Sequence, residues 1–355
     1  MTNTNQHHST LQSVQVNRQW TLVTRPVGAP TLGNFNFVES TKPSPQSREI
    51  LLRTVFLSLD PYMRGRMNDA KSYAEPVAVD AVMLGGTVCR VEESNHPDYS
   101  VGEWVVSSSG WQDYAISDGV NLLKLGRNPT QPSYALGVMG MPGLTAYMGL
   151  LDIGQPKAGE TVVVAAATGA VGSLVGQIAK LKGCKVVGIA GTEEKCRSAV
   201  EDLGVDICLN HKSVDLAQQL AKACDGGIDV YFENVGGKVF DAVLPLLNTC
   251  ARVPVCGLIS QYNATDLPQG PDRMFMLMGN LLFKRIRMQG FIVFDDYGHR
   301  YNEFRQEMSQ WLKEEKITYR EDLVEGLENT LESFIGLLQG KNFGKLVMRV
   351  GPDEL

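Results

Sequence analysis

The clearest pattern of apolar and polar positions lies between residues 161 and 182. Thr161 to Ala166 form an apolar run that includes three consecutive valines, which predicts a strand buried on both faces. A turn of small residues follows at 167–172. Beyond it, apolar residues recur at the spacing of one helix face, at Leu174, Val175, Ile178, Ala179 and Leu181. The segment therefore predicts a strand, a tight turn and an amphipathic helix.

The alternation of strand and helix continues to about residue 293. Further strands are predicted at 185–190, 206–209, 228–233, 252–259 and 287–293, with helices from about Glu193, Ser213 and Lys238. This order favours an α/β fold with a doubly wound parallel sheet and a ligand beyond the carboxyl ends of its strands. The apolar segment at 274–283 either covers the active site or forms a dimer contact.

The chain outside residues 161–293 has a different pattern of apolar and polar positions. Residues 15–125 predict short strands separated by Pro and Gly, which is typical of a compact barrel. Strands are expected at 16–23, 49–58, 82–92 and 104–108, and a loop at 26–45. Two amphipathic helices are predicted at 301–316 and 327–338, and a strand follows Gly340. We expect that strand to rejoin the N-terminal region, which makes the first domain discontinuous.

The turn after the first strand of the parallel sheet predicts an anion site. It reads A-x-x-G-x-x-G from Ala166. Because the first N–H groups of a helix have no partner within it, they point at whatever lies above the turn. Gly169 and Gly172 would let a pyrophosphate approach the backbone, and Gly176 would let the helix pack on the strand. The alternative is a tight strand-to-helix turn without a ligand.

The end of the next strand bears on which dinucleotide is bound. In NAD-binding folds an acid here holds the ribose hydroxyls, but Ala190–Thr192 carries no carboxylate. Lys195 follows within reach, which favours a 2′-phosphate and hence NADP. A solvated lysine is the alternative. Glu193 and Glu194 either face the phosphate or lie on the outer side of the helix, where carboxylates suit its N-terminus.

Three loops carry further candidate chemistry. Asn234 and the segment 256–262 follow two neighbouring strands of the parallel sheet, so both should face the cofactor. In the loop Asp60–Arg66, Tyr62 either anchors a surface loop or donates a hydrogen bond to a substrate oxygen.

Composition and charge narrow the possible partners. The net charge of −6 gives no electrostatic reason to expect binding to nucleic acid or to an anionic membrane. No run is long enough for a membrane span, and the start MTNTNQHHST lacks the pattern of a secretory signal. The seven cysteines are odd in number and contain no C-x-x-C pair. We therefore expect a cytoplasmic protein without a disulfide framework or a structural zinc loop.

Four motifs together resemble a known family. These are AAATGAVGSLVGQIAK from Ala165, YFENVGG from Tyr231, GMPGLTAY from Gly140 and NFGK from Asn342. They resemble the zinc-independent medium-chain dehydrogenase/reductases, in the branch of the prostaglandin reductases, or leukotriene B4 12-hydroxydehydrogenases, and the bacterial NADPH-dependent curcumin reductases. The resemblance extends from about Arg18 to Val350.

The resemblance implies a fold, an activity and a set of cofactor contacts. It implies a GroES-like catalytic domain at 1–140 and 301–355, and a Rossmann cofactor-binding domain at 141–300. It also implies NADPH-dependent reduction of the carbon–carbon double bond of α,β-unsaturated ketones and aldehydes. The implied NADPH contacts are Thr168, Gly169, Ala170, Val171 and the adjoining Gly172 for the pyrophosphate, Lys195 for the 2′-phosphate, and Asn234, Cys256, Gly257, Ile259, Ser260, Tyr262, Phe291, Ile292, Val293 and Asn342 for the ribose and nicotinamide.

Two departures from family patterns have consequences. Where the family often holds the 2′-phosphate with a tyrosine, this chain has His211, and an imidazole can also donate to phosphate. Where the zinc-dependent relatives carry Gly-His-Glu, this chain reads Leu84-Gly85-Gly86, so we expect no metal. Tyr62 and Tyr262 are the predicted catalytic donors to the substrate oxygen. The alternatives are a quinone oxidoreductase and an NADPH-binding protein without turnover. We expect a homodimer.

Overall fold

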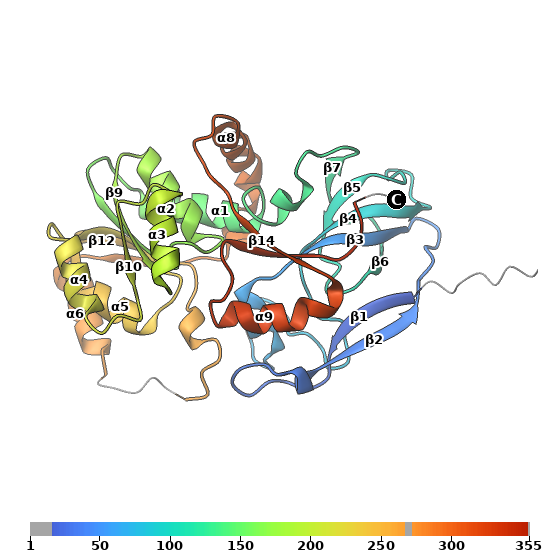
Figure 1. Ribbon diagram of the computed structural model, residues 1–355, viewed down its shortest axis with the longest axis horizontal. Helices are drawn as coiled ribbons and strands as arrows, with labels where there is room; N and C mark the ends of the chain where they lie inside the picture. The colour runs from blue at the N-terminus through green and yellow to red at the C-terminus, as the bar shows by residue number, and fades with distance from the viewer. Residues whose placement is uncertain (1–15, 267–271, 354–355) are drawn as a thin grey trace, which may run out of the picture.

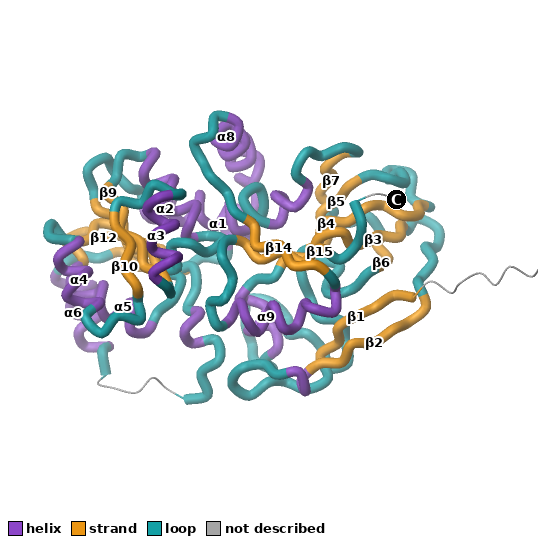
Figure 2. Tube along the Cα trace, in the orientation of Figure 1, coloured by secondary structure: helices purple, strands orange, loops and turns teal. Residues whose placement is uncertain are grey.

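The computed structural model describes residues 16–266 and 272–353. The N-terminal segment MTNTNQHHST, in which no secretory signal is expected, lies outside the described residues. One half of the molecule is built on a parallel sheet, and the other on a mixed sheet whose pairs are antiparallel except for β14 with β15 (Figure 1, Figure 2). The α/β class expected from the sequence is confirmed.

The parallel sheet has six strands in the order β10-β9-β8-β11-β12-β13. Their bounds are β8 Thr161–Ala165, β9 Lys185–Ala190, β10 Ile207–Asn210, β11 Ile228–Phe232, β12 Leu247–Val255 and β13 Arg287–Gly290. The chain runs outward from β8 to β10, then returns to β11 on the other side of β8 and runs outward again. The carboxyl ends of β8 and β11 therefore flank the topological switch point, where such sheets bind their ligands.

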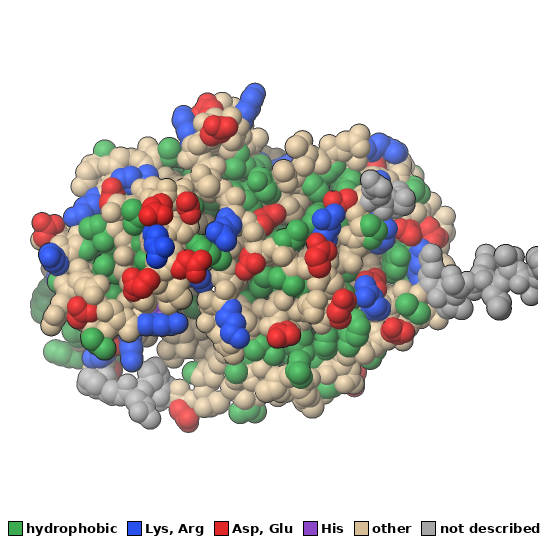
Figure 3. All heavy atoms as spheres, viewed as in Figure 1, with side chains coloured by type: hydrophobic (Ala, Val, Ile, Leu, Met, Phe, Trp, Pro, Cys, Tyr) green, Lys and Arg blue, Asp and Glu red, His purple; other side chains and the backbone are tan. Residues whose placement is uncertain are grey.

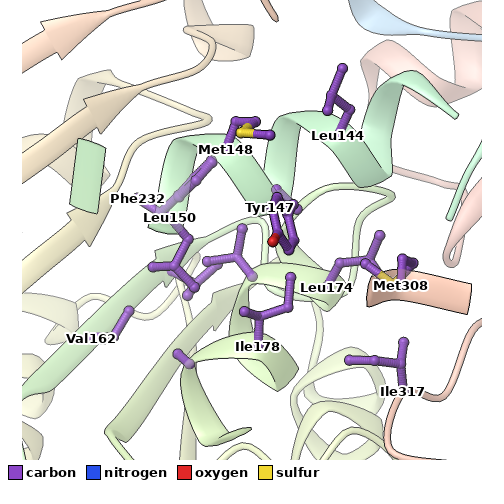
Figure 4. Packing of buried hydrophobic residues seen from close by; sticks show 14 of the residues in the cluster. Leu144, Tyr147, Met148, Leu150, Val162, Leu174, Ile178, Phe232, Met308 and Ile317 are labelled. Atoms are coloured by element: carbon purple, nitrogen blue, oxygen red, sulfur yellow. The ribbon is translucent and has the colours of Figure 1, made fainter. Parts of the chain in front are cut away.

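Both faces of this sheet are covered, which explains the continuous apolar run at 161–165. Val162 and Val164 join the core shared with α1, α2 and α8, whereas Val163 and Ala165 join the core shared with α4 and α5. Figure 4 shows the first core, where Tyr147 of α1 points toward α2, the helix that carries Ile178. The helices are α1 Met141–Met148, α2 Gly172–Leu181, α3 Glu193–Glu201, α4 Leu216–Ala223, α5 Gly237–Val243, α6 Met274–Phe283, α7 Val293–Tyr297, α8 Tyr301–Lys313 and α9 Thr330–Leu338.

The second half combines strands from both ends of the chain. Its sheet has the order β14-β15-β3-β4-β5-β7, with β6 also paired to β3, and β1 and β2 form a separate hairpin. β15 runs antiparallel to β3, with Val347 opposite Ser58. The bounds are β1 Val16–Leu22, β2 Phe35–Thr41, β3 Ile50–Ser58, β4 Thr87–Ser94, β5 Trp104–Ser107, β6 Tyr114–Ser117, β7 Leu123–Gly126, β14 Glu321–Glu325 and β15 Lys345–Arg349.

Several predicted boundaries were wrong. The predicted loop 26–45 contains the strand β2, whose partner in the hairpin, β1, supplies hydrogen bonds that composition does not reveal. The predicted strand 82–92 begins only at Thr87, because Met83 instead donates its N–H to Trp20 O. The predicted strand 287–293 ends at Gly290, and Val293 begins α7.

Candidate functional site

The glycine turn joins β8 to α2 at the switch point. Ala166 adopts the left-handed region with φ of 54°, and α2 begins at Gly172. A Cβ on Gly172 would lie 2.2 Å from Ala166 O, so this glycine is required by the chain itself. The predicted role of Gly172 in the approach of a pyrophosphate stays a prediction beside this steric requirement. A Cβ on Gly169 would meet nothing closer than Ala166 O at 3.2 Å.

The N-terminal turn of α2 adjoins a cavity of about 330 Å³. Its wall includes Thr168, Ser173 and Gly344, together with Arg320, whose guanidinium lies 3.9 Å from the centre of the Phe343 ring. Gly344 donates its N–H to Thr168 O at 3.1 Å, so the C-terminal segment contacts the turn directly. The helix N-terminus and Arg320 favour a phosphate group here, whereas Asp202, which also lines the cavity, disfavours one.

Three nitrogen-bearing side chains lie near the carboxyl end of β9: Lys195, His211 and Lys212. Lys195 lies in the first turn of α3 and donates from Nζ to Gly340 O at 2.7 Å. His211 follows β10, and its Nε2 lies 3.3 Å from the position of a Cβ on Gly191. Partial desolvation and then Lys212 lower the pKa of His211, and burial lowers the pKa of Lys195. Asp322 attracts Lys195, whereas Lys212 repels both Lys195 and His211. An anion placed beside the two lysines and His211 would offset that repulsion, which fits a 2′-phosphate.

Two carboxylates, those of Glu193 and Glu194, belong to the first turn of the helix that carries Lys195. Glu193 accepts a hydrogen bond from Asn210 Nδ2 at 2.8 Å, so this neighbour satisfies one of its oxygens. The exposed Glu194 exerts only a small effect on Lys195. Lys212 was not among the predicted site residues, because a lysine in a loop has no sequence pattern that separates it from a solvated one.

The ends of β11 and β12 are tied to the switch point. Asn234 donates from Nδ2 to Ala165 O at 2.8 Å, so its amide lies over the end of β8. The buried Glu233 accepts the N–H groups of Val235 and Gly236, at 2.7 and 2.8 Å, and burial raises its pKa. Cys256 donates its N–H to Glu233 O at 2.9 Å. These bonds fix the backbone that follows both strands.

The two predicted donors come from different halves of the molecule. Tyr62 lies in a 3-10 helix at Pro61–Met67, and Tyr262 follows a 3-10 turn at Ile259–Gln261. Leu258 donates its N–H to the Tyr262 hydroxyl at 3.4 Å, so that phenol folds back over its own loop. Burial raises the pKa of both phenols, and ionised Tyr73 would raise both further. Both hydroxyls therefore stay protonated at neutral pH and can donate.

The segment after β13 shows which predicted contacts can involve side chains. The Phe291 ring packs near Gly149, where a Cβ would lie 2.8 Å from it. Val293 is buried in the same core. Ile292 donates its N–H to Asp296 at 2.9 Å. The side chain of Val293 is therefore committed to packing, whereas the Phe291 ring is only partly buried and keeps an exposed part.

Asn342 and the loop that follows β12 contain the remaining residues that were predicted to contact the cofactor. Asn342 donates from Nδ2 to Gly344 O at 2.9 Å, which places its side chain against the segment that contacts the glycine turn. Ser260 donates its N–H to Val235 O at 3.0 Å. Burial raises the pKa of the Cys256 thiol to about 12, so this cysteine is a neutral filler. Ala170 and Val171 precede α2 and Gly257 follows β12.

Gly85, which stands where zinc-dependent relatives carry a histidine, is closely surrounded, so a side chain there would require Leu57 to move. A Cβ on Gly85 would lie 2.7 Å from Leu57 Cδ1 and 3.1 Å from Trp111. Within residues 16–266 and 272–353, no three His, Cys, Asp or Glu side chains are grouped as metal ligands would be. In the same residues, no helix is long and apolar enough to cross a membrane.

The fold and the turn at the switch point define a dinucleotide-dependent dehydrogenase or reductase. A model described as the N-terminal domain of oxidoreductases matches residues 18–125, and one described as zinc-binding dehydrogenase matches residues 170–314. NADPH-dependent curcumin reductase of Escherichia coli is 65% identical over 343 residues, which cover 97% of this chain and 99% of that protein. Mouse prostaglandin reductase 1 is 42% identical over 337 residues, covering 94% and 98%.

A solved structure agrees with these relatives. CurA from Vibrio vulnificus in complex with NADPH has 69% sequence identity and a TM-score of 0.92, covering 94% of this chain and 99% of the other. The chain belongs to the zinc-independent medium-chain dehydrogenase/reductases, in the branch of the curcumin and prostaglandin reductases. The family resemblance predicted from the four motifs is confirmed.

Proposed function

We propose that this protein is an NADPH-dependent reductase of the carbon–carbon double bond of α,β-unsaturated ketones and aldehydes. The observation that carries the proposal is the 65% identity to a curcumin reductase over nearly the full length of both chains. The glycine turn and the nitrogen-bearing side chains at the end of β9 support the proposal, because they would supply the two anion sites that a phosphorylated dinucleotide requires.

The proposed cofactor contacts follow the strand ends of the parallel sheet. The N-terminal turn of α2 would bind the pyrophosphate, and Lys195 with His211 would bind the 2′-phosphate. Asn234 and the backbone after β12 would lie beside the ribose and nicotinamide. When bound, NADPH supplies the hydride that adds to the β-carbon of the substrate.

The proposed role of the tyrosines follows from where charge develops. Addition of a hydride to the β-carbon moves the electron pair of the double bond toward the carbonyl and leaves an enolate oxygen. A phenol that donates a hydrogen bond to that oxygen lowers the barrier. Because burial raises the pKa of Tyr62 and Tyr262, both remain donors over the working pH range. The α-carbon then takes a proton from a phenol or from water.

Turnover of a substrate panel tests the proposal. The purified protein should oxidise NADPH in the presence of enones and enals, with deuterium from NADPH labelled at the transferred position appearing on the β-carbon of the product. A parallel panel of quinones distinguishes a quinone oxidoreductase. NADPH binding without consumption on either panel would refute the proposal and indicate a protein that only binds the cofactor.

We further propose a homodimer formed through α6 and the edge strand β13. Six apolar side chains of α6 are exposed, including Phe275 at 90% and Phe283 at 78%. In Figure 3, green side chains gather at the left edge, where Figure 1 places α6. β13 ends the sheet order, so its free edge can pair with the same edge of a second copy. The seven free thiols support a cytosolic location.

Sedimentation tests the dimer. The wild type should sediment at twice the chain mass, and a variant with Phe275→Glu and Phe283→Glu should sediment as a monomer. A dimer that persists in this variant would place the interface elsewhere.

A further inference from the structure

Arg64 is a buried cation that lies between the two candidate donors. Its side chain is only 3% exposed, and it lies two residues after Tyr62. Among residues 16–266 and 272–353, no carboxylate lies within ion-pair distance of it. The guanidinium instead donates five hydrogen bonds to neutral oxygens. A buried charge held entirely by neutral acceptors is costly, so its retention calls for a specific use.

The acceptors of Arg64 belong to three separate segments. Its Nη2 donates to Pro26 O at 3.2 Å and to Gly28 O at 2.7 Å, in the loop between β1 and β2. Its Nη1 donates to Asn68 Oδ1 at 2.6 Å, one turn further along its own segment. Its Nε donates to Gly28 O at 3.2 Å and to Asn263 Oδ1 at 3.1 Å.

The contact with Asn263 crosses from one half of the molecule to the other. Asn263 follows Tyr262 directly, on the loop after the parallel strand β12. The loop at Gly28 approaches the same place, since a Cβ on Gly28 would lie 3.6 Å from Thr265 Cγ2. The Arg64–Asn263 bond therefore links the segment that carries Tyr62 to the loop that carries Tyr262.

We propose that Arg64 is a positioning residue, which fixes the separation of the Tyr62 and Tyr262 segments through its hydrogen bond to Asn263. The proposal rests on the proposed enone reduction, because the two phenols are placed there as donors to one substrate oxygen. Only a guanidinium suits the task, since its planar fork serves acceptors on three segments at once, whereas a lysine offers one point of donation.

The bridging bond can be removed without touching either phenol. Asn263→Leu keeps the side-chain size and deletes the acceptor, and Asn263→Asp keeps an oxygen in the same place. Asn68→Ala is the matched control, because it deletes the other side-chain acceptor of Arg64 but one within the same segment. Displacement of a reacting group by about 1 Å costs up to ~100-fold in rate.

We expect Asn263→Leu to lower kcat with an enone by ~10- to ~100-fold while the Kd for NADPH stays within about twofold. Asn263→Asp should restore most of the activity, and Asn68→Ala should stay within about threefold of wild type. A double variant of Arg64→Lys with Asn263→Leu should be no slower than the slower single variant, because both substitutions remove the same Arg64–Asn263 bond. Additive losses would contradict the bridge.

Hydrogen–deuterium exchange supplies a readout independent of turnover. In Asn263→Leu, the amides of residues 27, 28 and 259–266 should exchange faster, with β9 and β15 unchanged. Unchanged exchange in both loops, or full kcat in Asn263→Leu, would overturn the proposal. If the wild type reduces no enone, the proposed function fails, and exchange alone still decides whether Arg64 joins the two segments. If Arg64→Lys does not fold, Asn263→Leu carries the same test.

Discussion

Replacement of Lys345 by methionine tests how the C-terminal strand is fixed to the Tyr62 segment. Lys345 is 1% exposed on β15, and its Nζ donates to Asp60 Oδ1 at 2.9 Å and to Leu59 O at 2.7 Å. The other oxygen of Asp60 accepts a hydrogen bond from the Ser58 hydroxyl. Asp60 precedes the 3-10 helix that carries Tyr62, so this ion pair joins chain segments 285 residues apart.

The magnitude follows from what the substitution leaves behind. Methionine fills the space of the lysine stem, so little packing is lost, but a buried carboxylate and a buried carbonyl lose their donor. Removing one partner of a buried ion pair costs ~3–5 kcal/mol. For a domain of this size, each kcal/mol lowers Tm by about 2–4 °C. We therefore expect Lys345→Met to lower Tm by ~6–20 °C.

Scanning calorimetry without cofactor is the assay, and two further variants identify the cause. Lys185→Met removes an exposed ion pair with Asp225, at 3.5 Å, and should cost less than about 1 kcal/mol. Combining Lys345→Met with Asp60→Asn should recover much of the lost stability, because no buried charge then remains. A Tm for Lys345→Met no lower than that of Lys185→Met would refute the reasoning.

Three further predictions concern the cofactor and the reaction. Tyr262→Phe should lower kcat by ~100-fold through loss of one donor to the enolate oxygen, while the Kd for NADPH, measured by fluorescence titration, stays unchanged. Lys195→Ala should weaken NADPH binding by ~10- to ~100-fold and leave NADH binding within about twofold, in calorimetric titrations of both. Because the pKa of His211 lies below its ordinary 6.5, the imidazole is neutral at pH 7, and a bound phosphate raises that pKa. Affinity for NADPH relative to His211→Phe should therefore increase as pH falls through 6.5, and a constant ratio from pH 8 to 5.5 would contradict this.

The fold was predictable where the information is local. The strand β8, its turn and α2 follow from a continuous apolar run and a helical period within about 20 residues. The hairpin strand β2 was missed because its seven residues are largely exposed, with little apolar alternation, and it is held by pairing with β1. The strands β6, β7 and β14 are short, at four or five residues each, so their patterns are too brief to recognise.

The location of the site, at the carboxyl ends of the parallel strands, could be predicted from the sequence. The contacts that its side chains make were less predictable. The parallel sheet brings Asn234 and the glycine turn to one edge, as the order of elements requires. The steric need for glycine at 172 was missed, because its contact with Ala166 O depends on the left-handed conformation of Ala166, which the sequence pattern does not show. Arg320 and Tyr73 are both exposed and were missed, since nothing in their local sequence distinguishes them from other exposed residues.

The segment 342–345 shows why such details matter for the proposed reaction. Gly344 donates to Thr168 O beside the proposed pyrophosphate site, and the next residue, Lys345, holds Asp60 beside Tyr62. A Cβ on Gly344 would lie 2.4 Å from Arg320 O, so this close approach requires glycine. One short stretch of backbone therefore sets the position of a cofactor turn relative to a donor loop. A shift of this strand would displace the donor loop relative to the hydride source, so we expect defects at Lys345 to lower kcat as well as stability.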